Sequence, residues 1–250
     1  MRYAVLSDVH SNLEALTAVL GHLASQRIDR FLGLGDFIGY GADPEACLTK
    51  LQACQMTGVC GNHEWACIGK MDLSWFNESA RRAVLWTRDR LSIADLDFLR
   101  RLPLTVSEEA FALAHASLIH PQRFDYLVDL AQAIDTANIA RTPFCFVGHT
   151  HVPLLVEVDL RRRGVARLLS SSAELTDVRL SSDAGLRYVI NPGSVGQPRD
   201  GDPRASCAVL DTEARTLAIH RVAYDIPTAQ RKIRQAQLPE FLADRLAVGR

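Results

Sequence analysis

Near its start the chain reads Arg2-Tyr3-Ala4-Val5-Leu6-Ser7-Asp8-Val9-His10, and this segment is the best indication of the architecture. Its apolar half, Arg2 to Leu6, predicts a β-strand, and two polar residues, Asp8 and His10, follow directly after it. The same arrangement recurs along the chain: Phe31 to Leu34 before Asp36, Met56 to Cys60 before Asn62 and His63, Phe111 to Ala114 before His115, and Phe144 to Val147 before His149 and His151. Because ligands of open α/β sheets bind beyond the carboxyl ends of strands, we expect these polar residues to converge on one crevice.

The segments between these strands favour amphipathic helices, the first of them capped by Ser11 or Asn12. Further helices are expected at Asp43 to Cys54, Asn77 to Leu91, Ser92 to Leu102, Asp129 to Ala140 and from about Pro227, and further strands at Thr105-Val106, Leu154 to Val158, Leu186 to Ile190, Ala205 to Leu210 and Thr216 to Val222. Arg161-Arg162-Arg163-Gly164 predicts a hairpin turn, and Ser170 to Ser182 a polar connection. Strand–helix alternation followed by strands indicates a mixed-sheet α/β fold with helices outside. No feature divides the chain, so residues 1–250 are expected to form a single domain.

The composition is that of an ordinary globular protein. Hydrophobic residues make up 48% and charged residues 23% of the 250 residues, and the formal net charge is −1, which gives no sign of an extended nucleic-acid-binding surface. No apolar stretch is long enough to span a bilayer, and no secretory signal opens the chain. The six cysteines form no Cys-x-x-Cys pair, so they are interpreted as reduced, buried residues of a cytoplasmic protein.

Taken singly, each polar motif is weak. A lone Asp-x-His is usually a turn carboxylate beside a surface histidine, and a lone His115 is more often a packed core residue than a ligand. Gly148-His149-Thr150-His151 is stronger, because two imidazoles two residues apart on an extended segment rarely serve packing. Five of the eight histidines lie at the predicted strand ends, together with two aspartates and an asparagine. Packing alone does not explain that concentration.

The chemistry of these donors favours metal ions. Nitrogen and oxygen donors without a thiolate suit Mn²⁺, Fe, Zn²⁺, Co²⁺ or Ni²⁺ better than a structural zinc cage. Seven ligands are too many for one ion and suit two, with one carboxylate bridging them. Two ions about 3.5–4 Å apart can clamp a phosphoryl group and generate a hydroxide between them.

The motif series resembles that of the calcineurin-like metallophosphoesterases. The matching motifs are Asp8-x-His10, Gly35-Asp36, Gly61-Asn62-His63-Glu64, His115 and Gly148-His149-Thr150-His151, with Asn191-Pro192-Gly193-Ser194 resembling a further turn of small bacterial members. The resemblance implies an α/β fold: a four-layer α/β/β/α sandwich of two mixed β-sheets flanked by helices, with the site at one end. It also implies two divalent metal ions, with Mn²⁺ as the expected metal.

The resemblance further implies a role for each residue. The first ion would bind Asp8, His10, Asp36 and His151, and the second would bind Asp36, Asn62, His115 and His149. Asp36 would bridge the two ions, and His63 would protonate the leaving oxygen.

The chain departs from the protein serine/threonine phosphatases of the same superfamily. Where those continue to an Asp-Arg pair, this chain has Gly39-Tyr40-Gly41, although Glu64 matches them. The Gly-Tyr-Gly form resembles small bacterial phosphoesterases, some acting on diadenosine polyphosphates and others on phosphodiesters. We therefore expect hydrolysis of a small phosphate ester or nucleotide anhydride. A protein phosphatase is the enzymatic alternative, and a non-catalytic scaffold is disfavoured because every ligand position is filled.

The loop from Asn191 to Arg204 is the expected substrate clamp in place of the missing arginine. Its glycines could form an anion-binding nest. Ser194, Arg199 and Arg204, together with Asn62, are candidate contacts to phosphate, since arginine forms forked, charge-assisted pairs with phosphate oxygens. The alternative is that the arginines only pair with Asp200 or Asp202 to rigidify the loop. The sequence leaves this choice open, as it does the substrate and the oligomeric state.

Overall fold

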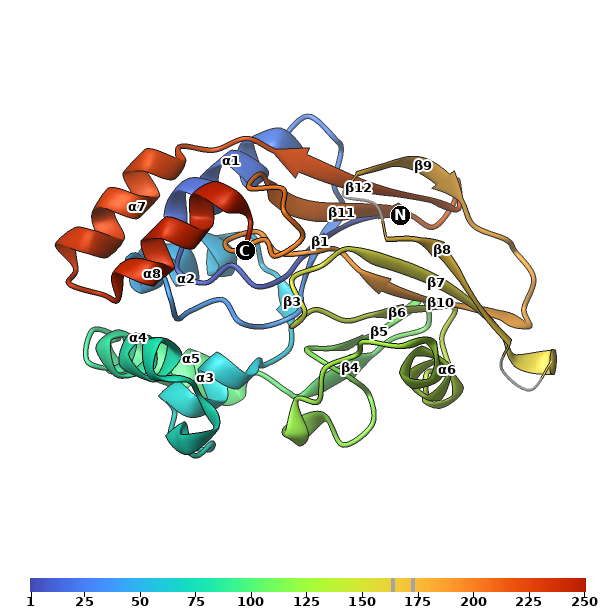
Figure 1. Ribbon diagram of the computed structural model, residues 1–250. Helices are drawn as coiled ribbons and strands as arrows, with labels where there is room; N and C mark the ends of the chain where they lie inside the picture. The colour runs from blue at the N-terminus through green and yellow to red at the C-terminus, as the bar shows by residue number, and fades with distance from the viewer. Residues whose placement is uncertain (163–164, 172–173) are drawn as a thin grey trace.

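Two β-sheets packed face to face form the centre of the molecule (Figure 1). The computed structural model describes residues 1–162, 165–171 and 174–250, and within these ranges each sheet has six strands. The strands are β1 Arg2–Leu6, β2 Arg30–Gly33, β3 Thr57–Gly58, β4 Thr105–Ser107, β5 Phe111–Ala114, β6 Phe144–Phe146, β7 Leu154–Asp159, β8 Val165–Ser170, β9 Leu175–Arg179, β10 Leu186–Asn191, β11 Ala205–Asp211 and β12 Thr216–Val222. The helices are α1 Leu13–Leu23, α2 Pro44–Ala53, α3 Asn62–Cys67, α4 Glu78–Arg88, α5 Ile93–Arg101, α6 Leu130–Ile139, α7 Ile226–Gln235 and α8 Glu240–Asp244.

Both sheets are mixed, as predicted. The first runs in the order β3-β2-β1-β11-β12-β9 and the second in the order β4-β5-β6-β10-β7-β8. β1, β2 and β3 are parallel neighbours in the first sheet, and β5, β6 and β10 are parallel neighbours in the second. The strands that precede the candidate site residues are therefore the parallel ones, and within each sheet their carboxyl ends share one edge.

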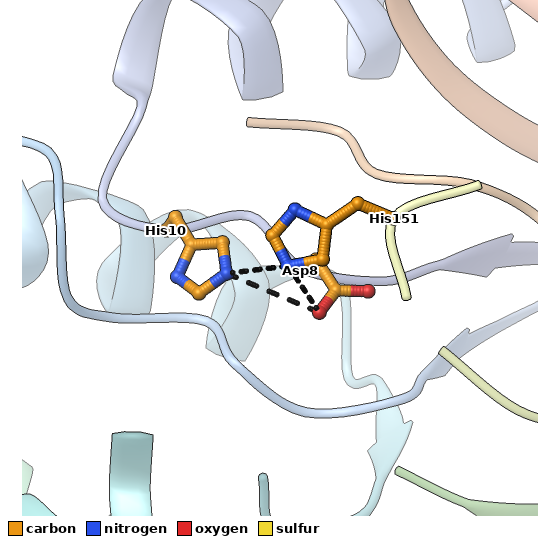
Figure 2. A group of neighbouring side chains, drawn as sticks. All are labelled: Asp8, His10 and His151. Carbon is orange, nitrogen blue, oxygen red and sulfur yellow. Dashed lines mark hydrogen bonds and ion pairs between the residues drawn. The ribbon is translucent and has the colours of Figure 1, made fainter. Parts of the chain in front are cut away.

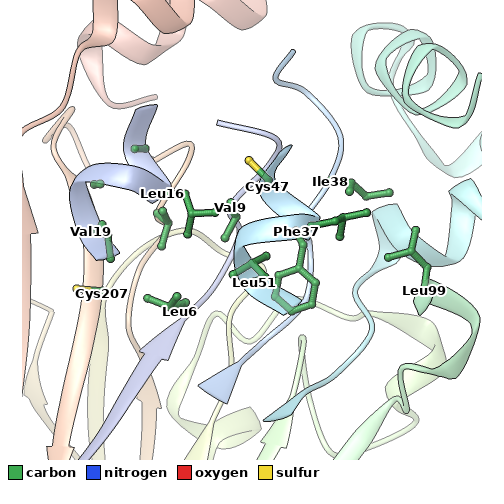
Figure 3. Packing of buried hydrophobic residues seen from close by; sticks show 14 of the residues in the cluster. Leu6, Val9, Leu16, Val19, Phe37, Ile38, Cys47, Leu51, Leu99 and Cys207 are labelled. Atoms are coloured by element: carbon green, nitrogen blue, oxygen red, sulfur yellow. The ribbon is translucent and has the colours of Figure 1, made fainter. Parts of the chain in front are cut away.

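The predicted four-layer sandwich is confirmed by the packing of apolar side chains. Between the sheets, Val5 and Leu32 of the first sheet belong to the same buried cluster as Phe146 and Ile190 of the second. The outer face of the first sheet is covered by α1 and α2, whose Leu16 and Leu51 pack with Leu6 and Phe37 (Figure 3). The outer face of the second sheet packs on α6, where Ala133 and Ala137 meet Val189.

The elements expected from the sequence are present, but several features, among them the short helix α8, differ from expectation. The polar connection predicted at Ser170 to Ser182 is wrong, because Leu175–Arg179 forms strand β9, which pairs with β12 at the edge of the first sheet. Its mostly exposed residues lack the alternation that marks a strand. Strand β8 and the six-residue helix α3 were not predicted. In the predicted hairpin turn, Leu160–Arg162 forms a short 3-10 helix between antiparallel β7 and β8, and residues 163 and 164 lie outside the described residues.

Other sequence-based expectations concern membranes and cysteines. No helix in the described ranges is both long enough and apolar enough to cross a membrane. All six cysteines are free thiols, and five are buried, as expected from their apolar surroundings.

The loop after β10 lies directly on the loop after β1. The backbone N–H of Gly196 donates to the carbonyl of Asp8 at 2.9 Å, and the side chain of Asn12 donates to the Gly196 carbonyl at 2.8 Å. The approach is so close that a Cβ on Gly196 would overlap the carbonyl oxygen of Val9. Glycine is therefore required here for contact between the two loops.

Replacing Gly196 by alanine is expected to destabilise the fold by about 1–3 kcal/mol, the usual cost of overpacking, because backbone must move on both sides. Gly21→Ala is the matched control. Gly21 lies in α1 with open space around its Cα, so alanine there is expected to stabilise by about 0.5–1 kcal/mol through helix propensity. Urea unfolding in the presence of a chelator measures both effects. A Gly196→Ala protein as stable as the wild type would contradict the close approach.

Candidate metal centre

The candidate ligands from both sheets meet at one place, although they are distant in sequence. Asp8 and His10 follow β1, Asp36 follows β2, and His115 follows β5. The backbone joins these loops: the His10 N–H donates to the Asp36 carbonyl at 2.9 Å, and the Gly148 N–H donates to the His115 carbonyl at 2.7 Å. The buried members of the set are Asp8, His10, Asp36, His115, His149 and His151, and Asn62 is half-buried.

One group of possible ligand atoms comprises Asp8, His10 and His151 (Figure 2). Asp8 Oδ1 lies 3.2 Å from His151 Nε2 and 3.9 Å from His10 Nε2, and the two imidazole nitrogens are 3.2 Å apart. The three side chains thus present their polar atoms to a common point.

A second group comprises Asp36, His115 and His149. Asp36 Oδ2 lies 3.3 Å from His115 Nε2, which in turn is 3.0 Å from His149 Nδ1 and 3.2 Å from Asn62 Oδ1. The same Asp36 oxygen is 3.7 Å from His10 Nε2 of the first group. Asp36 therefore lies between the two groups, and a third group of possible ligand atoms, from His10, Asp36 and His63, joins them.

The hydrogen bonds behind the imidazoles leave ring nitrogens free to bind a cation. Nδ1 of His10, His115 and His151 lies 3.1, 2.7 and 2.6 Å, respectively, from a backbone carbonyl oxygen. A carbonyl can only accept, so each Nδ1 carries the proton, and in a neutral ring the Nε2 lone pair faces the centre. Asp8 Oδ1 is buried and accepts no hydrogen bond from the part of the chain that the structure describes. Converging lone pairs on nitrogen and oxygen fit divalent metal ions.

Burial and charge act together on these groups. Burial lowers the pKa values of His10 and His151 below that of free histidine, which favours the neutral rings that metal binding requires. Burial alone would raise the pKa of Asp36, but the nearby His115 and His63 hold it well below its usual range. Burial by itself would lower the pKa of His115, but the Asp36 carboxylate raises it. The net result is a pKa of about 9. The centre thus keeps both aspartates ionised.

The backbone is strained at most of these positions. Asp8, His10, Asp36, His149 and His151 all have positive φ, between 48° and 65°. Left-handed backbone in residues other than glycine costs on the order of 1–3 kcal/mol each and concentrates at functional sites. No feature of the amino-acid sequence predicts this strain.

Glu64 is a buried carboxylate whose role the sequence did not reveal. It accepts hydrogen bonds from the backbone N–H groups of Asp36, Phe37, Ile38 and Gly61, at 2.7–3.2 Å. Burial and the Asp36 carboxylate raise the pKa of Glu64 to about 7, while the bond from Gly61 favours the ionised form. Glu64 therefore ties the loop after β2 to the start of α3. A glutamate at the third position of a helix is the sequence signal that could have indicated it.

His63 lies beside this centre, and its ring faces the carboxylate of Asp36. Its Nε2 is 4.0 Å from Asp36 Oδ2, and its ring packs against Tyr40 and Phe76 at 4.5 and 5.1 Å between centroids. Its Nδ1 is buried and has no hydrogen-bond partner in the described ranges. A side chain at Gly39 would overlap the ring. Aromatic packing and the close approach of Gly39 thus hold the His63 ring in place.

A cavity of about 180 Å³ opens onto the centre. Asp36, Asn62, His63 and Arg199 line it, and aromatic residues form much of its wall. The Arg199 guanidinium donates to Gln197 Oε1 at 2.9 Å and lies 5.9 Å from the centre of the Tyr40 ring. Arg199 thus forms part of the wall of this cavity beside Tyr40.

The other two candidate substrate contacts lie elsewhere. Ser194 is buried, donates to the Asp8 carbonyl at 2.8 Å and accepts from the Gln197 N–H at 2.8 Å, so it supports the ligand loop. Arg204 pairs with Asp202 at 2.7 Å and lies 3.6 Å from Glu174. Among the described residues, those lining the cavity do not include Ser194 or Arg204.

Comparison with known proteins identifies the family. Residues 1–215 match the calcineurin-like phosphoesterase superfamily domain. An uncharacterized protein of Methanocaldococcus jannaschii is 38% identical over 251 residues, covering 99% of this chain and 98% of that protein. The crystal structure of a metallophosphoesterase from Sphaerobacter thermophilus is 41% identical with a TM-score of 0.87, and each chain is covered completely. A hypothetical protein from Pyrococcus horikoshii shares the fold, with a TM-score of 0.78 at 19% identity, covering 100% of this chain and 98% of that one. The chain therefore belongs to the calcineurin-like phosphoesterase superfamily and is a metal-dependent phosphoesterase.

Proposed function

We propose that this enzyme holds two divalent cations and hydrolyses a small phosphodiester or a dinucleoside polyphosphate. The first cation would bind Asp8, His10, Asp36 and His151, and the second Asp36, Asn62, His115 and His149, with Mn²⁺ as the expected metal. The observation that carries this proposal is the position of Asp36 Oδ2, 3.7 Å from His10 Nε2 in one group and 3.3 Å from His115 Nε2 in the other. A carboxylate so placed suits a bridge between two ions.

The protein's own residues have separate tasks in this reaction. When bound, the two cations supply Lewis-acid activation of the phosphoryl group and lower the pKa of a water molecule. Asn62, one of the second cation's proposed ligands, also lines the cavity and would orient a phosphate oxygen. His63 would give its proton to the leaving oxygen. Arg199 would hold a phosphate oxygen, or a second phosphate, on the solvent side of the centre.

The surroundings of His63 support a small substrate over a phosphoprotein. The residues in place of the phosphatase Asp-Arg pair are Gly39, Tyr40 and Gly41, and Tyr40 packs on His63 instead of holding phosphate. The complete ligand set argues against a non-catalytic scaffold.

We also propose a single domain in the cytoplasm. Helix α7, beyond the matched region, is joined to the rest of the chain by Lys232, which pairs with Glu14 at 2.5 Å and Asp43 at 2.9 Å. Its Ile233 packs in the same cluster as Ala83 of α4. The free thiols suit a reducing compartment.

The metal assignment predicts that chelation abolishes turnover of bis-p-nitrophenyl phosphate and that added Mn²⁺ restores it. Asp36→Asn should abolish activity and release both ions, because the bridging carboxylate neutralises two dications at once. Asp97→Asn, which removes an exposed carboxylate of α5, is the control. Elemental analysis measures the metal content. An Asp36→Asn protein that retains both ions would contradict the bridging role.

The role of His63 predicts a loss that depends on the leaving group. His63→Ala should lower kcat by about 10²–10⁴-fold, as for a lost general acid, with metal content near that of the wild type. The loss should shrink for nitrophenolate, a good leaving group that needs little protonation. Steady-state kinetics on a series of leaving groups tests this, and an equal loss across the series would remove His63 from the role.

The position of Arg199 predicts a selective effect on KM. Arg199→Ala should raise KM for a polyphosphate substrate far more than for p-nitrophenyl phosphate, which has no distal phosphate. Arg199→Lys should restore little, since a point charge lacks the guanidinium fork. Arg204→Ala is the comparison, because its guanidinium is occupied by Asp202. If both alanine variants keep the wild-type KM for every substrate, the loop has no part in binding.

A further inference from the structure

A second hollow of about 230 Å³ adjoins the cavity of the metal centre. Met71, Trp75 and Arg123 line both, so the two spaces meet at these side chains. Trp65 completes an aromatic lining of the second hollow. A water molecule takes up roughly 30 Å³ in the liquid, so the hollow has room for a group of many heavy atoms.

Trp75 is an exposed aromatic on a rigid support. Its side chain is 75% exposed, at the end of a short 3-10 helix, Leu73–Trp75, between α3 and α4. Asp72 caps this helix by accepting the Ser74 N–H at 2.8 Å. The next residue, Phe76, packs against His63 at 5.1 Å and against the core. The backbone that carries the exposed indole is thus anchored on both sides beside the catalytic cavity.

Trp65 connects the hollow with the metal centre through the ring of Phe124. Its ring packs edge-on against Phe124 at 5.4 Å, and Phe124 lies 5.9 Å from the ring of His115. Lys70 and Arg123 bring positive charge to the lining and Asp72 brings negative charge, so basic side chains outnumber the acidic one. Arg123 also pairs with Asp125 at 2.9 Å. A planar aromatic group carrying an anionic phosphate is complementary to both features, because bases stack on aromatic side chains and phosphates pair with cations.

We propose that this hollow binds the nucleobase of the substrate, with Trp75 as the stacking platform. The substrate is then a nucleoside phosphodiester or nucleoside polyphosphate, and a base-free phosphate ester would leave the hollow unused. This inference rests on the proposed function, since it requires the scissile phosphate to lie at Asp36. It also gives a reason for an exposed tryptophan at this position.

The test compares two non-hydrolysable probes that differ only by a nucleoside: adenosine 5′-(α,β-methylene)diphosphate and methylenediphosphonate. Their dissociation constants are measured by calorimetry on the Mn²⁺-loaded protein. The wild type should bind the adenosine probe about tenfold or more tightly than the diphosphonate, a typical gain from one stacked base. Trp75→Ala should remove this advantage and leave diphosphonate binding unchanged. Trp75→Phe should keep most of it.

The control is Phe241→Ala, which removes another exposed aromatic, 59% accessible and far along the chain in α8. It should bind both probes like the wild type. A second measurement uses the three tryptophans: the adenosine probe should quench the fluorescence of the wild type, and Trp75→Phe should lose most of that quenching.

Two results would overturn the inference: equal affinity of the wild type for both probes, or an equal loss for both probes in Trp75→Ala. Either leaves the proposed function intact if diphosphonate binding still requires Mn²⁺ and is lost in Asp36→Asn. The proposed function fails separately if the diphosphonate binds equally with and without metal.

Discussion

The arrangement of the whole site depends on one carboxylate, that of Asp36. Its Oδ1 accepts the backbone N–H of His63 at 3.0 Å, while its Oδ2 faces His10 from one sheet and His115 from the other. Its backbone N–H donates to Glu64. A single residue therefore links the loops after β1, β2 and β5 with the first turn of α3, and a shift of that residue would move both candidate ligand groups together.

Such a centre is costly for the protein to form. Three buried carboxylates, those of Asp8, Asp36 and Glu64, lie close enough for Asp36 to act on the pKa of the other two. Asp8 and Asp36 also have left-handed backbone, and Asp8 Oδ1 has no hydrogen-bond donor among the described residues. Each of these features opposes folding. The apolar core between the sheets supplies stabilisation remote from the centre. Cations that bind only the folded state would add to it, since they neutralise the carboxylates and satisfy the lone pairs.

The sequence predicts the framework of this site well, because the framework follows a local rule. A short apolar strand ends, and a polar residue follows; Asp8 and His115 were found in this way. This local rule does not reveal the role of Glu64. Its four N–H donors come from two separate loops, which meet only in the folded chain. The different contacts of the Arg199 and Arg204 side chains also could not be predicted from the sequence. Both follow the same turn, and only the fold decides that Arg204 faces Asp202 while Arg199 lines the cavity.

The fold thus separates two tasks along the chain. The candidate ligands lie just beyond the strand ends, mostly in loops that backbone hydrogen bonds join to one another, such as His10 N–H to the Asp36 carbonyl and Gly148 N–H to the His115 carbonyl. The aromatic lining comes from connections outside the sheets, Met71 to Phe76 between α3 and α4 and Arg123 to Tyr126 after β5. Loops tolerate changes of sequence and length that strands do not. Substitutions in these two connections are therefore expected to change the shape of the cavity while the candidate ligands keep their positions.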